Sequence, residues 1–178
     1  MQFCAFETEL GWFGLGWTEA GISRAHLPGL GQGAVAARLG RDAELAEPPK
    51  AVVAVIEMIQ KYASGAEVDF SAVPLDLDGV PEFHRRAYAL LVGIGWGGTT
   101  TYGALARQLG DVGLSRAVGQ AMGANPIPLI IPCHRVLASD GKPGGFSAPG
   151  GAESKLRMLA LEGVQVGPGD PAQQSFAF

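Results

Sequence analysis

Short apolar and aromatic runs alternate with turn residues over the first thirty positions of the chain. The runs cover residues 3–8, 11–17 and 22–27, and residues 18–21 (TEAG) have the composition of a tight turn. Runs of this length, rich in aromatic and β-branched residues, are typical of strands. We therefore predict a small sheet at the N-terminus. The Gly- and Ala-rich stretch 29–49 favours no particular element.

A helical period follows in residues 49–65. Pro49 suits the first turn of a helix, and Gly65 suits its end. The apolar positions of this segment repeat on one helical face, namely Val52, Val55, Ile56 and Ile59. Residues 68–79 then predict a strand followed by a linker that contains proline and aspartate, so we place a domain boundary near Gly79.

In the second half of the chain, apolar residues recur at helical spacing in four segments. The first segment, residues 81–94, has an apolar face made of Phe83, Ala87, Leu90, Leu91 and Ile94. The last segment, residues 150–163, is predicted to bury Leu156, Leu159 and Ala160, with Glu162 at its end.

The two segments between them are short helices joined by a tight turn. They cover residues 101–110 and 115–125, with Thr101 and Ser115 as candidate N-caps and a glycine at the end of the first. Such a pair predicts a helix-turn-helix. The Asp-Gly dipeptide at 140–141 favours a hairpin, and a hairpin after a helix-turn-helix would complete a winged helix.

The composition is that of a globular protein, with 47% hydrophobic and 17% charged residues in 178. No apolar run approaches the roughly 20 residues that a membrane span needs, so no membrane association is predicted. Cys4 and Cys133 are the only cysteines, which excludes a disulfide framework and a Cys/His zinc motif. We expect a cytoplasmic protein, associated with the nucleoid if it is bacterial.

Charge is distributed unevenly. The formal net charge of −4 argues against a general nucleic-acid binder. Residues 1–78, however, hold 5 Lys/Arg and 11 Asp/Glu and are acidic. Residues 79–178 hold 8 Lys/Arg and 6 Asp/Glu and are slightly basic. A polyanionic partner, if there is one, therefore belongs to the second half.

The second helix of the predicted pair is built from unusually small residues. Gly119 and Gly123 each lower the stability of a helix by about 1 kcal/mol relative to alanine, and the side chains of Ala117 and Ala121 are small. Two explanations are open: close packing against another helix, or close approach to a nucleic-acid groove. Arg116 favours the second explanation. A cation at a helix N-terminus is unfavourable because it opposes the helix dipole, so its presence there calls for another reason, such as contact with a nucleic acid.

The chemistry of the chain centres on the segment PLIIPCHRV. A thiol becomes a good nucleophile when a base removes its proton, and His134 stands beside Cys133. Adjacent residues point apart, so we expect a water to relay the proton. Glu162 is a candidate to orient the imidazole. From these residues alone an inert buried cysteine is the more common explanation of Cys133, and Asn125 before Pro126 is also typical of a turn.

Residues 83–163 closely resemble the O6-alkylguanine-DNA alkyltransferases, that is, the methylated-DNA–protein-cysteine methyltransferase family. The resemblance rests on four motifs in the family's order and spacing, TTTYGALA, SRAVGQAMGANPIPLIIPCHRV, DGKPGGFS and LALEG. It implies direct-reversal repair, in which O6-alkylguanine is flipped out of the duplex and its alkyl group moves irreversibly to the protein, in a single-turnover suicide reaction.

The resemblance also implies a role for each catalytic residue. Cys133 would accept the alkyl group. His134 would deprotonate the thiol of Cys133, and Glu162 would orient His134. Asn125 would brace the turn. Tyr102 would press on a phosphate and then donate a hydrogen bond to the base.

Two further sets of residues follow from the same resemblance. Arg116 would fill the gap in the duplex, and the DNA contacts would come from Arg116, Ala117, Gly119, Ala121, Tyr102, Thr101 and Arg135. The pocket for the alkylated base would be lined by Met122, Pro128, Gly144, Gly145, Phe146 and Ser147. Phe146 stands where many relatives have tyrosine, which removes one hydroxyl from this pocket.

The implied architecture has two domains. Residues 1–78 would form an α/β scaffold of a small sheet plus helix, ribonuclease-H-like, and residues 79–165 a mainly α winged-helix (helix-turn-helix) domain, followed by a flexible tail at 166–178. The implied partner is double-stranded DNA containing O6-alkylguanine, bound through the minor groove by a monomer. No cofactor and no metal are expected.

Three other functions stay open from the sequence. An alkyltransferase-like protein would bind the lesion without reacting, although such proteins replace the cysteine that is present here. A winged-helix regulator would bind duplex DNA without regard to damage. A cysteine hydrolase is the weakest alternative, because no nucleophile-elbow motif is present.

Overall fold

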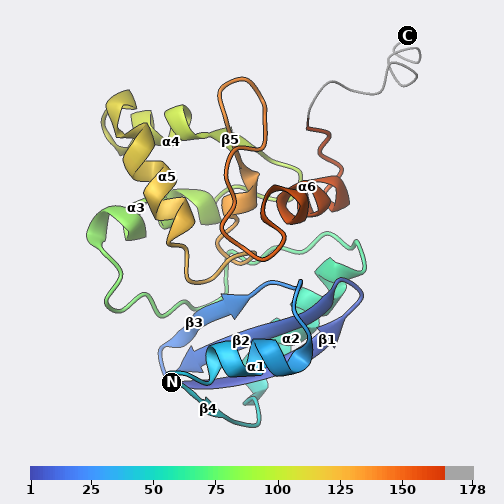
Figure 1. The fold of residues 1–178 in the computed structure, drawn as a ribbon. Helices are drawn as coiled ribbons and strands as arrows, with labels where there is room; N and C mark the ends of the chain where they lie inside the picture. The colour runs from blue at the N-terminus through green and yellow to red at the C-terminus, as the bar shows by residue number, and fades with distance from the viewer. Residues whose placement is uncertain (167–178) are drawn as a thin grey trace, which may run out of the picture.

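The computed structural model describes residues 1–166, and the tail predicted at 166–178 falls almost wholly outside this range. Figure 1 shows a two-part α/β arrangement, with an N-terminal sheet and its two helices on one side and the C-terminal helices on the other. The halves share one hydrophobic core, because buried residues of the sheet and of the C-terminal helices belong to one contiguous cluster. No helix in the described part of the chain is long and apolar enough to cross a membrane.

The three predicted N-terminal strands are confirmed as β1 (Gln2–Thr8), β2 (Gly11–Thr18) and β3 (Gly21–His26). They pair as antiparallel hairpins. The stretch that favoured no element contains α1 (Gln32–Leu39) and the short β4 (Glu44–Leu45). β4 pairs in parallel with β1, so the sheet order is β3-β2-β1-β4.

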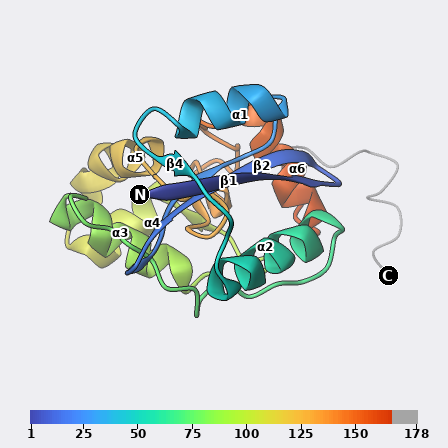
Figure 2. The same ribbon diagram turned by 90° about the horizontal axis from the view of Figure 1, so that it is seen from below.

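The sheet is covered on both faces, with α1 on one side and α2 on the other (Figure 2). Strand alternation explains this arrangement, since neighbouring residues point to opposite faces. Phe3 packs with α1, whereas Cys4 belongs to the main core. Gly14 allows α1 to approach the sheet closely. A Cβ there would lie 2.4 Å from Leu39 and 2.7 Å from Val35.

The predicted helix after Pro49 is confirmed as α2 (Lys50–Ala63), which also buries Tyr62. The strand expected within 68–79 is wrong. A turn closes between Phe70 and Val73, and Pro74 offers no N–H for a ladder. The segment joins β3 only through an isolated bridge at Leu75.

The C-terminal half places its predicted helices at α3 (Glu82–Val92), α4 (Tyr102–Leu109), α5 (Ser115–Gly123) and α6 (Gly151–Leu161). Thr101 caps α4 as expected, since its hydroxyl accepts from the Ala104 N–H. Ser115 was wrongly predicted as a cap. The 3-10 turn η1 (Val112–Leu114) leads into α5, and the Ser115 hydroxyl donates back to Val112 instead.

Two further expectations are corrected. The Asp-Gly turn forms at 138–142, but the strand before it, β6 (Val136–Leu137), pairs in parallel with β5 (Thr100–Thr101), and no strand returns after the turn. The buried face of α6 is also different from the predicted one. Leu159 is buried as predicted, but Leu156 and Ala160 are exposed. The helix instead buries Lys155, Met158 and, just past its end, Glu162.

Candidate active site

Cys133 begins a short 3-10 turn, η2 (Cys133–Arg135), whose three side chains are all buried. The chain reaches it through a tight turn in which Leu129 has a positive φ of 79°. Asn125 braces this turn from both sides. Its amide donates to the Ile131 carbonyl at 2.8 Å, and its side-chain oxygen accepts from the Ile127 N–H at 3.0 Å.

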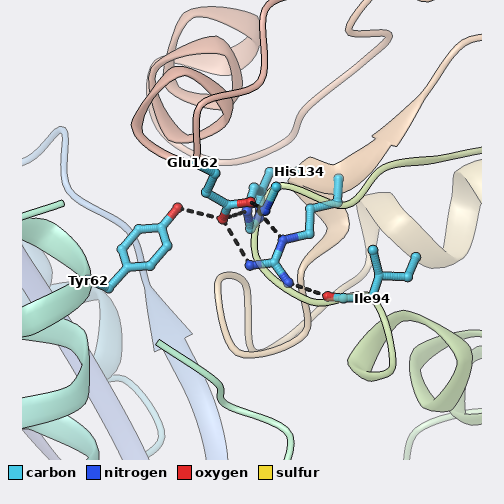
Figure 3. A network of polar contacts seen from close by, with 6 residues as sticks. Tyr62, Ile94, His134 and Glu162 are labelled. Atoms are coloured by element: carbon cyan, nitrogen blue, oxygen red, sulfur yellow. Dashed lines mark hydrogen bonds and ion pairs between the residues drawn. The ribbon is translucent and has the colours of Figure 1, made fainter. Parts of the chain in front are cut away.

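The carboxylate of Glu162 is the centre of a buried polar network (Figure 3). It accepts hydrogen bonds from His134 at 2.7 Å, from the Tyr62 hydroxyl at 3.0 Å and from two guanidinium nitrogens of Arg135 at 2.8 and 3.0 Å. Arg135 also donates to the Ile94 carbonyl. Burial raises the pKa of Glu162, but hydrogen bonds from His134 and Arg135 outweigh it and lower the pKa to about 2.

The imidazole of His134 has one available basic nitrogen. Nε2 faces the ionised Glu162, so Nε2 carries the ring proton and donates a hydrogen bond to the carboxylate. Nδ1 is buried and has no hydrogen-bond partner among residues 1–166. Burial lowers the pKa of His134 despite the bond to Glu162, so the ring is neutral at pH 7. His134 can therefore accept one proton at Nδ1.

Several influences act on the pKa of the Cys133 thiol in opposite directions. Burial is the largest influence and raises its pKa. A hydrogen bond from Asn125, the charge of Lys155 and nearby backbone amides act in the opposite direction. The free protein therefore holds a neutral thiol beside a neutral imidazole. The nearby cation and hydrogen bonds favour the thiolate once the proton leaves.

Lys155 is fully buried on α6, and its ammonium donates to the Val136 carbonyl at 2.5 Å. It also lies 5.8 Å from the ring centre of Tyr102 and 5.9 Å from that of Phe146. Burial lowers its pKa to about 8 even though the charge of Cys133 raises it. The side chain is thus largely protonated at pH 7 and supplies a positive charge next to the cysteine.

A hollow of about 560 Å³ opens onto Cys133 between α5 and the loop that precedes α6. Its lining consists of Tyr102, Ser115, Gly119, Met122, Gly123, Cys133, Gly145, Phe146 and Ser147. The Ser147 hydroxyl donates to the Gly123 carbonyl at 3.0 Å, which ties the loop to the end of α5. The hollow, which we call the base hollow, is of a size that suits a small ligand.

The two glycines of α5, Gly119 and Gly123, face open space. A Cβ added at Gly119 or Gly123 would meet nothing within 4 Å, which rules out close helix packing as the reason for these glycines. Arg116 is exposed at the start of the same helix. The glycines and Arg116 therefore leave an accessible surface next to the base hollow.

Comparisons with known proteins agree with this geometry. A family profile described as "6-O-methylguanine DNA methyltransferase, DNA binding domain" matches residues 82–164. The chain is 40% identical over 119 residues to the methylated-DNA–protein-cysteine methyltransferase of Methanothermobacter thermautotrophicus, covering 67% of this chain and 65% of that protein, just under two thirds. It is 42% identical over 116 residues to the protein of the same name from Mycolicibacterium paratuberculosis, covering 65% and 68%.

Two other similarities are informative. The "DNA base-flipping protein" of Thermus thermophilus is 43% identical over 111 residues, covering 62% of this chain and 72% of that protein. The crystal structure of Mycobacterium tuberculosis OGT in complex with DNA superimposes with a TM-score of 0.73 at 29% identity, over 92% of this chain and 93% of that one. This chain belongs to the methylated-DNA–protein-cysteine methyltransferase family.

The structure brings together most residues that the family resemblance singled out. Around Cys133 it places Asn125, which forms a hydrogen bond with the thiol, and His134, which is hydrogen-bonded to Glu162. Around the base hollow it places Tyr102, Met122, Gly145, Phe146 and Ser147. Gly144 contacts Tyr102, since a Cβ there would lie 3.1 Å from that ring. Pro128 lies outside the base hollow, in the lining of a neighbouring one. Thr101 and Ala117 are partly exposed.

The structure does not support two of the predicted DNA contacts. Arg135 is 5% exposed and its guanidinium is bound to Glu162 and Ile94, so it is not free to meet a phosphate. Ala121 is 0% exposed, and its carbonyl accepts from the Tyr88 hydroxyl. Both residues belong to the internal support of the site.

Sequence reasoning missed two contributors to the site. Lys155 was passed over because a lysine in an amphipathic helix is normally placed on the solvent side. Tyr62 lies 100 positions from Glu162 and in the other half of the chain. No group of three or more His, Cys, Asp or Glu residues within 1–166 is arranged to hold a metal ion.

Proposed function

We propose that this protein repairs alkylated DNA by direct reversal, taking the alkyl group of O6-alkylguanine onto Cys133. The observation that carries this proposal is the pairing of a buried thiol at the base hollow with a neutral imidazole whose bare nitrogen is Nδ1. The family membership of the chain supports the same activity.

The reaction is a displacement at carbon. His134 takes the thiol proton at Nδ1, through the water that the sequence predicts, and Glu162 stabilises the imidazolium. The sulfur then forms a bond to the alkyl carbon while the carbon–O6 bond breaks, and its electron pair stays on the guanine. Burial raises the pKa of Tyr102, so its hydroxyl stays protonated and can donate to this leaving group. The thioether product is stable to water, so each molecule acts once.

The substrate base must leave the helix to reach Cys133, because a stacked guanine cannot enter a buried hollow. Flipping costs a few kcal/mol, and less for a base that pairs badly. In the proposal, α5 lies along the minor groove through Gly119, and Arg116 occupies the gap in the duplex. Residues 79–165 then act as a helix-turn-helix DNA-binding domain on a ribonuclease-H-like scaffold formed by residues 1–78. The helix pair α4 and α5 supports this assignment.

The deciding experiment is intact-protein mass spectrometry after incubation with a duplex that contains O6-methylguanine. The proposal requires a mass gain of one methylene group on the peptide that contains Cys133. Tight lesion binding without a mass gain would favour a non-catalytic base-flipping protein. Equal binding to damaged and undamaged duplexes would favour a regulator.

Replacement of Lys155 by methionine should slow alkyl transfer at pH 7 by about tenfold, because losing the adjacent cation raises the pKa of Cys133 further. The measurement is the pH dependence of Cys133 alkylation by iodoacetamide, together with the transfer rate. Lys142→Met is the matched control, since Lys142 is exposed and pairs with Asp140. An unchanged alkylation profile in Lys155→Met would reduce Lys155 to a packing role.

Replacement of Arg116 by alanine should lower transfer from duplex DNA about tenfold more than transfer from free O6-benzylguanine, which needs no flipping. Single-turnover rates on the two substrates give the comparison. Arg107→Ala, in the neighbouring helix α4, controls for the loss of one positive charge. Equal losses on both substrates would exclude a role for Arg116 in the flipped duplex.

A further inference from the structure

A second hollow reaches Cys133 from the side of the N-terminal sheet. It has a volume of about 430 Å³ and shares Met122, Gly123, Cys133, Phe146 and Ser147 with the base hollow. The rest of its lining is different and comes from the turn before Cys133, from β3, from the region of α1 and from the loop before α6. We call it the side hollow.

Positive charge gathers at the sheet end of the side hollow. Arg24, Arg38 and Arg41 line it, which are three of the five basic residues in an otherwise acidic half of the chain. The one carboxylate in this lining is Asp42, 3.7 Å from Arg24. The lining therefore carries a net positive charge.

A neutral histidine adds to this lining. Burial lowers the pKa of His26, and its Nδ1–H donates to the Leu27 carbonyl at 2.8 Å. Its Nε2 is buried without a hydrogen-bond partner in the described part of the chain. Neither the arginines nor this ring takes part in the transfer chemistry set out above.

The geometry of displacement decides what would enter the side hollow. The sulfur, the attacked carbon and the leaving O6 must lie in line, so every atom beyond the first carbon projects sideways from that line. Pro128 and Asn125 line the side hollow and not the base hollow, whereas Cys133 lines both. A methyl group does not extend past Cys133, whereas a longer substituent would pass Pro128 into the side hollow.

We infer that this protein favours O6 substituents that are long enough to enter the side hollow and end in a carboxylate, that is, O6-(carboxyalkyl)guanines. The inference rests on the proposed alkyl transfer and specifies its substrate class. The sulfur bonds to the first methylene, the electron pair of the broken bond returns to O6, and O6 takes up a proton. The carboxylate stays on the new thioether, facing Arg24 and Arg38.

The test compares two lesions in the same duplex, O6-(3-carboxypropyl)guanine and O6-(3-carbamoylpropyl)guanine. They have the same length and differ in terminal charge, so their rate ratio reports on the side hollow alone. Single-turnover rates are read from the mass of the intact protein, with O6-methylguanine as the reference for each variant. We expect the carboxylate to react about fivefold faster than the amide, as two partly solvated charge contacts allow.

Variants of the lining locate the effect. Arg24→Gln combined with Arg38→Gln should bring the ratio close to one. Asp42→Asn should raise the ratio, because it removes the opposing charge and frees Arg24. Arg157→Gln is the control, because Arg157 lies on α6 and lines neither hollow.

A wild-type ratio near one would overturn the inference, and so would a ratio that survives the double substitution. Equal losses on both lesions in the double variant would mean that the arginines contact DNA phosphates, which also overturns it. Transfer of methyl but of neither longer group would show that the side hollow is closed to substituents. Absence of transfer from all three lesions would instead remove the proposed repair activity itself.

Discussion

We expect Cys133→Ala to abolish alkyl transfer while binding to lesion-containing DNA stays intact. The loss should be at least about 10⁴-fold, because the substitution removes the acceptor atom itself and no neighbouring nucleophile can replace it. Binding should persist because the exposed face of α5, with Gly119 and Arg116, is unaffected. The alanine is also small enough to leave the Glu162 network in place.

Two measurements check this result, transfer of a labelled methyl group and binding of the same duplex by fluorescence anisotropy. Cys4→Ala is the matched control, since Cys4 is the other free cysteine. It lies buried in β1, where burial raises its pKa to about 11, so it should be unreactive. Transfer that survives in Cys133→Ala but not in Cys4→Ala would move the acceptor to the sheet and contradict the assignment.

The sequence predicts the elements whose signals are local. Three N-terminal strands and α2 follow from apolar spacing, and Thr101 is recognisable as a cap. The strand expected after residue 68 fails because a turn and Pro74 override the apolar pattern. β4 has two exposed residues, so no pattern could reveal it.

The residues of the site also divide into those whose position is predictable from the sequence and those whose position is not. Cys133, His134 and Asn125 lie within one short segment, so their proximity is visible in the sequence. The burial of Lys155 and Arg135 is not visible, because each charge is acceptable only where a distant partner neutralises it or bonds to it. Arg135 is paired with Glu162, and Lys155 with the Val136 carbonyl. Tertiary contacts therefore decide that these two side chains face inward.

Burial keeps the Cys133 thiol neutral in the free protein, against the effect of the Lys155 charge. A permanent thiolate would react with any electrophile, whereas a buried thiol with a raised pKa is protected. Because Nδ1 of His134 is buried, it can accept a proton only from a group inside the site, such as the Cys133 thiol. Glu162 holds the imidazole in the tautomer that leaves Nδ1 able to take this proton.

Replacing Glu162 by glutamine should therefore damage both chemistry and stability. Alkyl transfer should fall about 10²-fold, because the amide no longer stabilises the imidazolium of His134. The free energy of unfolding should fall by about 3 kcal/mol, because Arg135 is left buried with its charge unpaired. Single-turnover kinetics and urea unfolding measure the two effects. Tyr62→Phe is the matched control, since it removes one hydrogen bond from a neutral donor to the same carboxylate, leaves no charge unpaired and should cost less, about 2 kcal/mol.

The pH dependence of unfolding separates charge from packing in this variant. Hydrogen bonds lower the pKa of Glu162 from 4.5 to about 2 against the effect of burial. The carboxylate therefore stabilises the fold fully above pH 4.5, and this contribution of about 3 kcal/mol is lost as the pH falls from 4.5 towards 2, where the unfolded chain takes up the proton first. The difference in unfolding free energy between wild type and Glu162→Gln should shrink over this window. A difference that stays constant from pH 6 to pH 3 would mean that Glu162 acts through packing alone, and the electrostatic role given to it at His134 would fail with it.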